Sequence, residues 1–187
     1  MEPLLPRVVR TGADYETERA ASRLRLAEAG EDRRVDLGGG LVLVFETAET
    51  VLSALEEWLR AERVDDPDRI AAEATAFSAL LAGEQALGAT LYVDDADPAG
   101  LADRVAELEA VGAAVSLVIA GRRITARSDA EDVGAGAMPL AFPLDQWERR
   151  ALLGGATVEV VVDHPRHRAS VALRAEQLPA ISVDVER

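Results

Sequence analysis

The sequence predicts an α+β protein, with a mostly antiparallel mixed sheet of about eight strands and about five helices. Short apolar runs separated by polar turns, as in RVDLGGGLVLVF and TVEVVVDHPRHRASVAL, are typical of hairpins. Other stretches repeat apolar residues at helical spacing, which indicates amphipathic helices. Hairpins dominate over strand–helix–strand units, so the pattern favours α+β over a parallel α/β fold.

The N-terminal part is predicted to hold a tail and one outer helix. Residues 1–12 form the tail, and residues 13–187 form a single domain. Strong helix formers fill residues 13–34, where Gly30 is a stop signal. Leu24 and Leu26 give this helix only a thin apolar stripe, so we expect it to pack outside the domain.

A hairpin is predicted around the three consecutive glycines that follow. Val35 and Leu37 alternate with polar residues before the glycines, and an apolar strand runs from Leu41 to Phe45 after them. Glycine-rich loops also bind phosphate, but they do so where a helix begins. This one opens a strand, so the pattern favours the hairpin.

Two helices are predicted next. The first covers residues 48–64 and has Thr47 or Thr50 as its cap, and the second begins at Asp66 and Pro67. Apolar residues at helical spacing are expected to face the core. They are Val51, Leu55, Trp58 and Leu59 in the first helix, and Ile70, Phe77, Leu80 and Leu81 in the second.

The second half is predicted to contain one helical crossover and more hairpins. A strand at 86–95, a helix starting at Asp97 and Pro98 and ending at Gly112, and a strand at 114–121 could add a parallel strand pair. The remaining elements are a hairpin partner at 124–129, a proline-flanked edge strand within 139–143, a helix at 144–155, and strands at 156–164 and 168–174.

Composition excludes several kinds of chemistry. The chain has no cysteine and no lysine, which removes disulfides, thiolate metal ligands and Schiff-base catalysis. Its 34 acidic and 20 basic residues give a net charge of -14, which disfavours nucleic acids and anionic membranes. No apolar run approaches the ~20 residues of a membrane span, and the N-terminus lacks a signal-peptide pattern, so a cytoplasmic protein is expected.

Both histidines lie in one stretch, VDHPRHR, at the end of a valine-rich strand. His164 and His167 stand beside Asp163, and Pro165 indicates a turn. Metal binding would need further ligands, from Asp163 or from the carboxylates listed below. Acid–base catalysis is a second interpretation, because histidine titrates near neutral pH. The third interpretation, a polar turn between strands, is favoured, and we expect no metal or cofactor.

The helical stretch EEWLRAER forms a second polar cluster. Glu56, Arg60 and Arg63 are spaced by four and seven residues, so we expect them to share a face and form ion pairs. The planar guanidinium group of arginine also binds carboxylate or phosphate groups. We expect this helix and the histidine turn to converge on one pocket. The candidate site residues are His164, His167, Asp163, Glu46, Glu57, Arg60, Glu62 and Arg63.

Taken in order, RRVDLGGGLVLVFE, EEWLRAER and VDHPRHRAS resemble a bacterial family, domain of unknown function 3501. The resemblance spans roughly residues 15–173. It implies a redox-linked accessory role, because members resemble companions of rubrerythrin-like di-iron proteins and iron–sulfur oxidoreductases. The matching residues are Arg33, Arg34, Val35, Leu37, Gly38, Phe45, Glu46, Glu57, Leu59, Arg60, Glu62, Arg63, Asp163, His164 and Pro165.

The chain also departs from the family pattern. Ala54 replaces a glutamine, His167 replaces a tyrosine, and Met138 and Ala141 stand where the resemblance implies a histidine and an arginine. We therefore expect an accessory or interaction protein, with an iron-dependent oxidoreductase as its partner. The alternative is a small-molecule-binding protein or enzyme with a cleft near the histidine turn and the EEWLRAER helix. The sequence does not indicate an oligomeric state.

Overall fold

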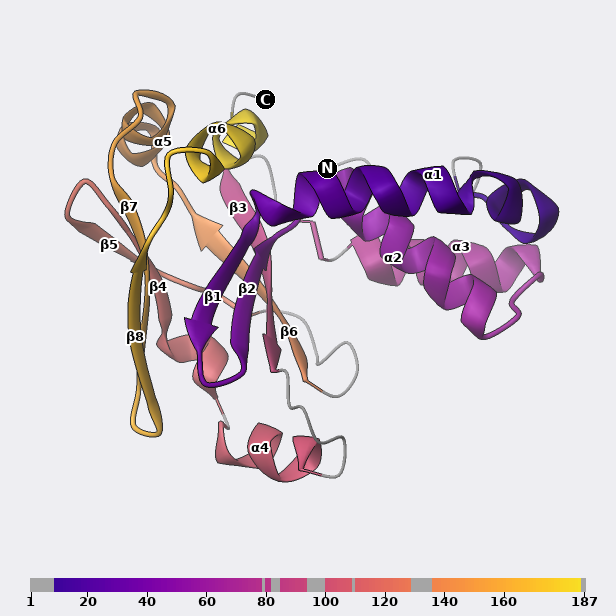
Figure 1. Ribbon diagram of the computed structural model, residues 1–187, viewed down its shortest axis with the longest axis horizontal. Helices are drawn as coiled ribbons and strands as arrows, with labels where there is room; N and C mark the ends of the chain where they lie inside the picture. Colours follow the sequence, from indigo (N-terminus) through magenta and orange to yellow (C-terminus); the bar gives the residue numbers. More distant parts are fainter. Residues whose placement is uncertain are drawn as a thin grey trace.

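Two four-stranded antiparallel sheets and a lobe of three helices make up the computed structural model (Figure 1). The structure describes residues 9–78, 80–81, 85–93, 100–108, 110–128 and 136–185, apart from the side chains of Arg25, Glu28 and Ala29. Within these residues no helix is long and apolar enough to cross a bilayer.

The first sheet has the strand order β1-β2-β3-β6, and the second has the order β5-β4-β7-β8. The strands of the first sheet are β1 (Arg34–Gly38), β2 (Leu41–Phe45), β3 (Ala86–Val93) and β6 (Ala137–Pro143). Those of the second are β4 (Val115–Ile119), β5 (Arg122–Thr125), β7 (Val158–His164) and β8 (His167–Ala172). All the pairings are antiparallel in the part of the chain that the structure describes.

The helices occupy three places around the sheets (Figure 1). The lobe consists of α1 (Gly12–Glu31), α2 (Ala48–Ala61) and α3 (Pro67–Ser78). Helix α4 (Leu101–Glu107) lies at one end of the sheets. Helices α5 (Gln146–Leu153) and α6 (Gln177–Ser182) lie at the opposite end. Short 3₁₀ turns at Val111–Ala114 and Val183–Val185 complete the described helices.

Two separate apolar clusters hold the fold. The larger one lies between the sheets, where alternate residues of each strand point inward, for example Val158, Val160 and Val162 on β7. The smaller one lies inside the lobe and joins α2 to α3 through residues such as Leu55 and Phe77. The lobe therefore has an apolar core of its own.

The predicted α+β class and antiparallel hairpins are confirmed. The eight strands, however, form two sheets rather than one. The expected parallel pair is wrong, because β3 and β4 lie in different sheets. The predicted helix start at Asp97 and Pro98 lies outside the described residues. Its end comes earlier than Gly112, because Ala110 is in a left-handed conformation (φ 60°) that starts a 3₁₀ turn.

The start of α2 shows why a local pattern can predict a helix boundary. The Thr47 side chain accepts a hydrogen bond from the Thr50 backbone, and the Thr50 side chain accepts one from the Thr47 backbone. This reciprocal cap satisfies amides that the first turn would leave unpaired. Both predicted caps therefore act together. The predicted start of α3 at Pro67 is also confirmed.

Candidate functional site

The structure places the predicted site residues in three separate regions. In Figure 1 the β7–β8 turn, with His164 and His167, lies at the free end of the second sheet, whereas α2 lies in the lobe on the far side of the molecule. Glu46 follows β2, where the chain passes from the sheet into the lobe. The expected convergence of the histidine turn and the EEWLRAER helix on one pocket is wrong, because β2 leads into a lobe that points away from the turn.

The histidine turn packs against the glycine hairpin. His167 Nε2 lies 3.0 Å from the carbonyl oxygen of Leu37, which makes this nitrogen the donor. His164 Nδ1 accepts a hydrogen bond from the Arg166 backbone at 3.2 Å. Arg104 donates to the Gly39 carbonyl at 3.0 Å from the other side. The bond from His167 to Leu37 joins the ends of the two sheets, and the bond from Arg104 ties α4 to the glycine hairpin.

Gly39 is the tightest point of this contact. Its φ is +57°, and an added Cβ would lie 3.1 Å from His167 Cε1. We expect Gly39→Ala to lower the free energy of unfolding by roughly 2 kcal/mol, because it adds a steric contact to the left-handed backbone penalty. Gly38→Ala is the matched control, since Gly38 has φ +75° but open space around its Cβ position. Urea unfolding of both variants checks this, and equal losses would contradict a role for His167.

A metal centre finds no support at this turn. Among the residues that the structure describes, no group of three or more His, Asp or Glu side chains could hold a metal ion. Asp163 pairs instead with Arg168 at 3.1 Å, and both side chains are well exposed. The geometry fits the interpretation of a polar turn that connects strands.

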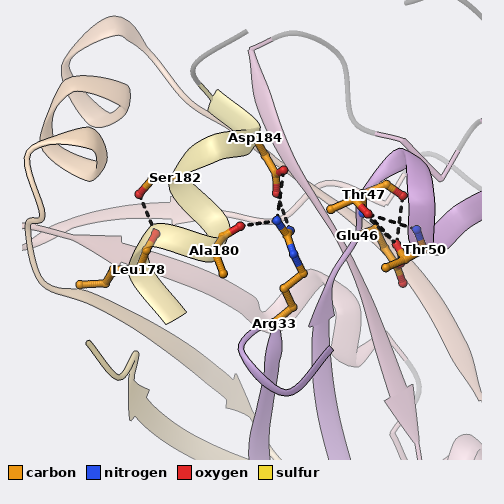
Figure 2. Close-up of polar contacts among 8 residues, drawn as sticks. All are labelled: Arg33, Glu46, Thr47, Thr50, Leu178, Ala180, Ser182 and Asp184. Atoms are coloured by element: carbon orange, nitrogen blue, oxygen red, sulfur yellow. Dashed lines mark hydrogen bonds and ion pairs between the residues drawn. The ribbon is translucent and has the colours of Figure 1, made fainter. Parts of the chain in front are cut away.

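Glu46 belongs to the junction between sheet and lobe (Figure 2). Its Oε2 accepts a hydrogen bond from the Thr50 hydroxyl at 2.6 Å, so the carboxylate braces the cap of α2. On the neighbouring strand, burial raises the pKa of Tyr92, and the negative charge of Glu46 raises it further. Glu46 thus has a structural role at the base of the lobe.

Arg33 fixes the C-terminal segment at the same junction (Figure 2). Its guanidinium binds Asp184 at 2.6 Å and donates to the Ala180 carbonyl. The Arg33 side chain is only 8% exposed, and Asp184 is 24% exposed. This first residue of the RRV motif therefore holds α6 and the turn after it against the start of β1.

Inside the lobe, Glu56 anchors the N-terminal segment. Its side chain is fully buried and accepts hydrogen bonds from the Arg10 backbone at 2.8 Å, from Nε at 2.9 Å and from Nη2 at 2.7 Å. A buried carboxylate with three charge-assisted or backbone donors is well satisfied. The expected pairing of Glu56 with Arg60 and Arg63 along α2 is wrong, because Glu56 turns inward to Arg10.

The other charged residues of α2 bind α1. Arg19 pairs with Glu57 at 2.8 Å, and Arg60 pairs with Glu16 at 2.5 Å. Arg63 has no ion pair or side-chain hydrogen bond with any residue that the structure describes. It takes a left-handed conformation (φ 52°) just after α2, where the chain turns toward α3. These pairs hold α1 onto α2.

A pocket of about 340 Å³ opens at the end of the lobe, between α1 and α2. Tyr15 lies in its wall and is 1% exposed. Its buried hydroxyl has no hydrogen-bond partner among the described residues. Burial, followed by the nearby Glu57 carboxylate, raises the pKa of Tyr15 to about 12. The charged residues of the pocket are Glu16, Glu56, Arg60, Arg63 and Asp65.

The Glu57–Arg19 pair predicts a pH effect. The bond from Arg19 holds the pKa of Glu57 below its ordinary value of 4.5, against an opposing effect of burial. A lowered pKa stabilises the fold above the unfolded value, and this stability is lost as the pH falls through the folded value. We therefore expect wild type to exceed Glu57→Gln in unfolding free energy at neutral pH, and the difference to shrink as the pH falls below 4.5 and to vanish once the pH is below the lowered pKa of Glu57. Denaturant unfolding across this range is the measurement, and a pH-independent difference would contradict it.

The sequence pattern did not point to Arg10, Tyr15, Glu16 or Arg19, the partners of the α2 cluster. Arg10, Glu16 and Arg19 lie 38 to 46 residues before the residues of α2 that they bind. Tyr15 belongs to no sequence motif. Spacing along one helix reports neighbours on that helix alone. A pair between two helices has no such periodic signal.

Comparison with known proteins agrees with this description of the fold. The model of the family Protein of unknown function (DUF3501) matches residues 7–185, so the chain belongs to that family. No curated protein matches it. The crystal structure of a novel protein of unknown function from Burkholderia pseudomallei K96243 is similar, with a TM-score of 0.81 and 23% identity over 98% of this chain and 96% of that chain. This likeness shows a shared fold.

Proposed function

We propose that this chain is an accessory protein that acts by binding a partner, and that the partner is an iron-dependent oxidoreductase of the rubrerythrin-like or iron–sulfur kind. The partner class comes from the family resemblance of the sequence. We place the protein in the cytoplasm, where cysteine-free, acidic proteins of this kind are ordinary.

One observation carries the binding role: several charged residues of the family motifs are used to hold the protein together. Arg33 binds Asp184, Glu57 binds Arg19, and Arg60 binds Glu16. Groups engaged in this way are not poised to abstract a proton or attack a substrate. The motifs maintain the shape of two packed sheets with a protruding lobe. A role confined to shape favours the binding of a partner over catalysis.

Affinity purification of the chain from its source cells, under mild cross-linking, tests this proposal. We expect an iron-containing oxidoreductase to be enriched over a control purification, and the purified complex to contain iron. Repeated purification without any enriched oxidoreductase would argue against the proposal.

The pocket between α1 and α2 favours a second candidate function, the binding of a small anionic molecule. Arg63 offers a guanidinium there that pairs with no described residue, and Arg60 is held nearby by an exposed pair with Glu16. Succinate is a suitable probe, because a dicarboxylate matches the two guanidinium groups. Binding that is lost in Arg63→Ala, at unchanged unfolding free energy, would support this candidate, and no heat of binding in calorimetry would exclude it for dicarboxylates.

A further inference from the structure

Most of the charged groups in the pocket between α1 and α2 are already bound within the fold. Glu56 accepts three hydrogen bonds from Arg10, and Arg60 pairs with Glu16 at 2.5 Å. Each of these two carboxylates has an arginine as its partner, so neither pair gives the pocket a net charge. The groups that can bind another molecule are therefore the ones outside these pairs.

Arg63 and Asp65 are the two remaining charged residues of the pocket. Both are exposed, and neither has an ion pair or a side-chain hydrogen bond with any residue that the structure describes. They lie on either side of the buried Val64, in the turn between α2 and α3. The left-handed backbone of Arg63 (φ 52°) is uncommon outside glycine, and such conformations cluster at binding sites. The pocket thus presents one guanidinium and one carboxylate, which together carry no net charge.

The start of α1 adds hydrogen-bond donors to the same pocket. Thr11 is the N-cap of this 20-residue helix, but its side chain makes no capping bond, and both Thr11 and Gly12 line the pocket. The first amides of a helix have no partner within the helix and favour a negative group. In the pocket wall, the buried hydroxyl of Tyr15 also has no described partner. Buried polar groups are normally satisfied, so this one indicates a site that a ligand or water completes.

We propose that this pocket binds an α-amino acid with an aliphatic side chain, in its zwitterionic form. The carboxylate of the ligand binds the Arg63 guanidinium and the first amides of α1, and its ammonium group binds the Asp65 carboxylate. The buried side chains of Tyr15, Leu59 and Val64 give the pocket an apolar wall for the aliphatic part. This inference rests on the second candidate function, the binding of a small carboxylate at this pocket, and names the class of ligand.

The test uses L-valine as the probe and isothermal titration calorimetry as the readout. Two matched molecules each lack one of its charged groups. Isovalerate has the carbon skeleton of valine without the ammonium group, and isobutylamine has its side chain and ammonium group without the carboxylate. We expect the full chain to bind L-valine at least about tenfold more tightly than either molecule, because each of them loses one charge-assisted contact.

The variant Asp65→Asn separates the two charged contacts. It removes the partner of the ammonium group, so affinity for L-valine should fall at least about tenfold while affinity for isovalerate does not fall. Urea unfolding should match wild type, since Asp65 has no described partner. Asp68→Asn is the matched control, because Asp68 is exposed in the first turn of α3, outside the pocket, and loses the same charge. Equal losses of L-valine affinity in the two variants would overturn the proposal.

The outcomes separate this inference from the candidate function on which it rests. If succinate or isovalerate binds and L-valine binds no more tightly than isovalerate, the pocket takes carboxylates and only the amino-acid assignment is wrong. If L-valine, isovalerate and succinate all fail to bind, the second candidate function is wrong and this inference fails with it. Neither result bears on the proposed oxidoreductase partner, which the affinity purification tests separately.

Discussion

Replacing Arg33 with alanine is expected to lower the free energy of unfolding by about 3 kcal/mol, because it leaves a partly buried carboxylate and a backbone carbonyl without their donor. Asp184 and the Ala180 carbonyl both depend on this guanidinium (Figure 2). For a chain of this size the melting temperature should fall by roughly 6–12 °C. Differential scanning calorimetry and urea unfolding are the measurements.

The neighbouring arginine provides a matched control. Arg34 is exposed and lies in β1, one residue along the chain. Its replacement by alanine should change the unfolding free energy by no more than about 0.5 kcal/mol. Asp184→Asn tests the charge alone, because the amide can still accept one hydrogen bond, and it should lose less than Arg33→Ala. If Arg33→Ala and Arg34→Ala were equally stable, the C-terminal segment would not depend on this ion pair.

Arg33 also illustrates what the sequence could and could not predict. The helix that it holds, α6, was not expected, because six residues that include Pro179 show no helical period. The Arg33–Asp184 bond joins positions 151 residues apart, and no local pattern reports such a distance. By contrast, the start of α2 was predicted from Thr47 and Thr50, since a cap involves only neighbouring residues.

The division of the strands follows the same logic. Alternation of buried and exposed residues predicted the hairpins, because it needs only one inward face. The alternation does not specify to which sheet a strand belongs, so a single sheet containing both β3 and β4 was expected. The candidate site failed for a related reason. The order of the motifs along the chain was known, but the direction in which β2 sends the chain into the lobe was not.

Replacing Glu56 with alanine is expected to destabilise the fold by about 3 kcal/mol, whereas the same change at Glu57 should cost about 1 kcal/mol or less. The two residues are adjacent, and each binds one arginine. They differ in burial, since the Glu56 side chain is 0% exposed and that of Glu57 is 33% exposed. A buried pair has little competition from water or salt, so its loss is felt more.

A double-mutant cycle isolates the interaction. Glu56→Ala, Arg10→Ala and the double variant are unfolded in urea, and the coupling energy should exceed about 1.5 kcal/mol, compared with below about 1 kcal/mol for Glu57 and Arg19. Added salt should reduce the second coupling and leave the first nearly unchanged. Equal couplings for the two pairs would mean that burial of Glu56 does not strengthen its bond to the N-terminal segment. The lobe would then be held mainly by the contacts of α2 with α3.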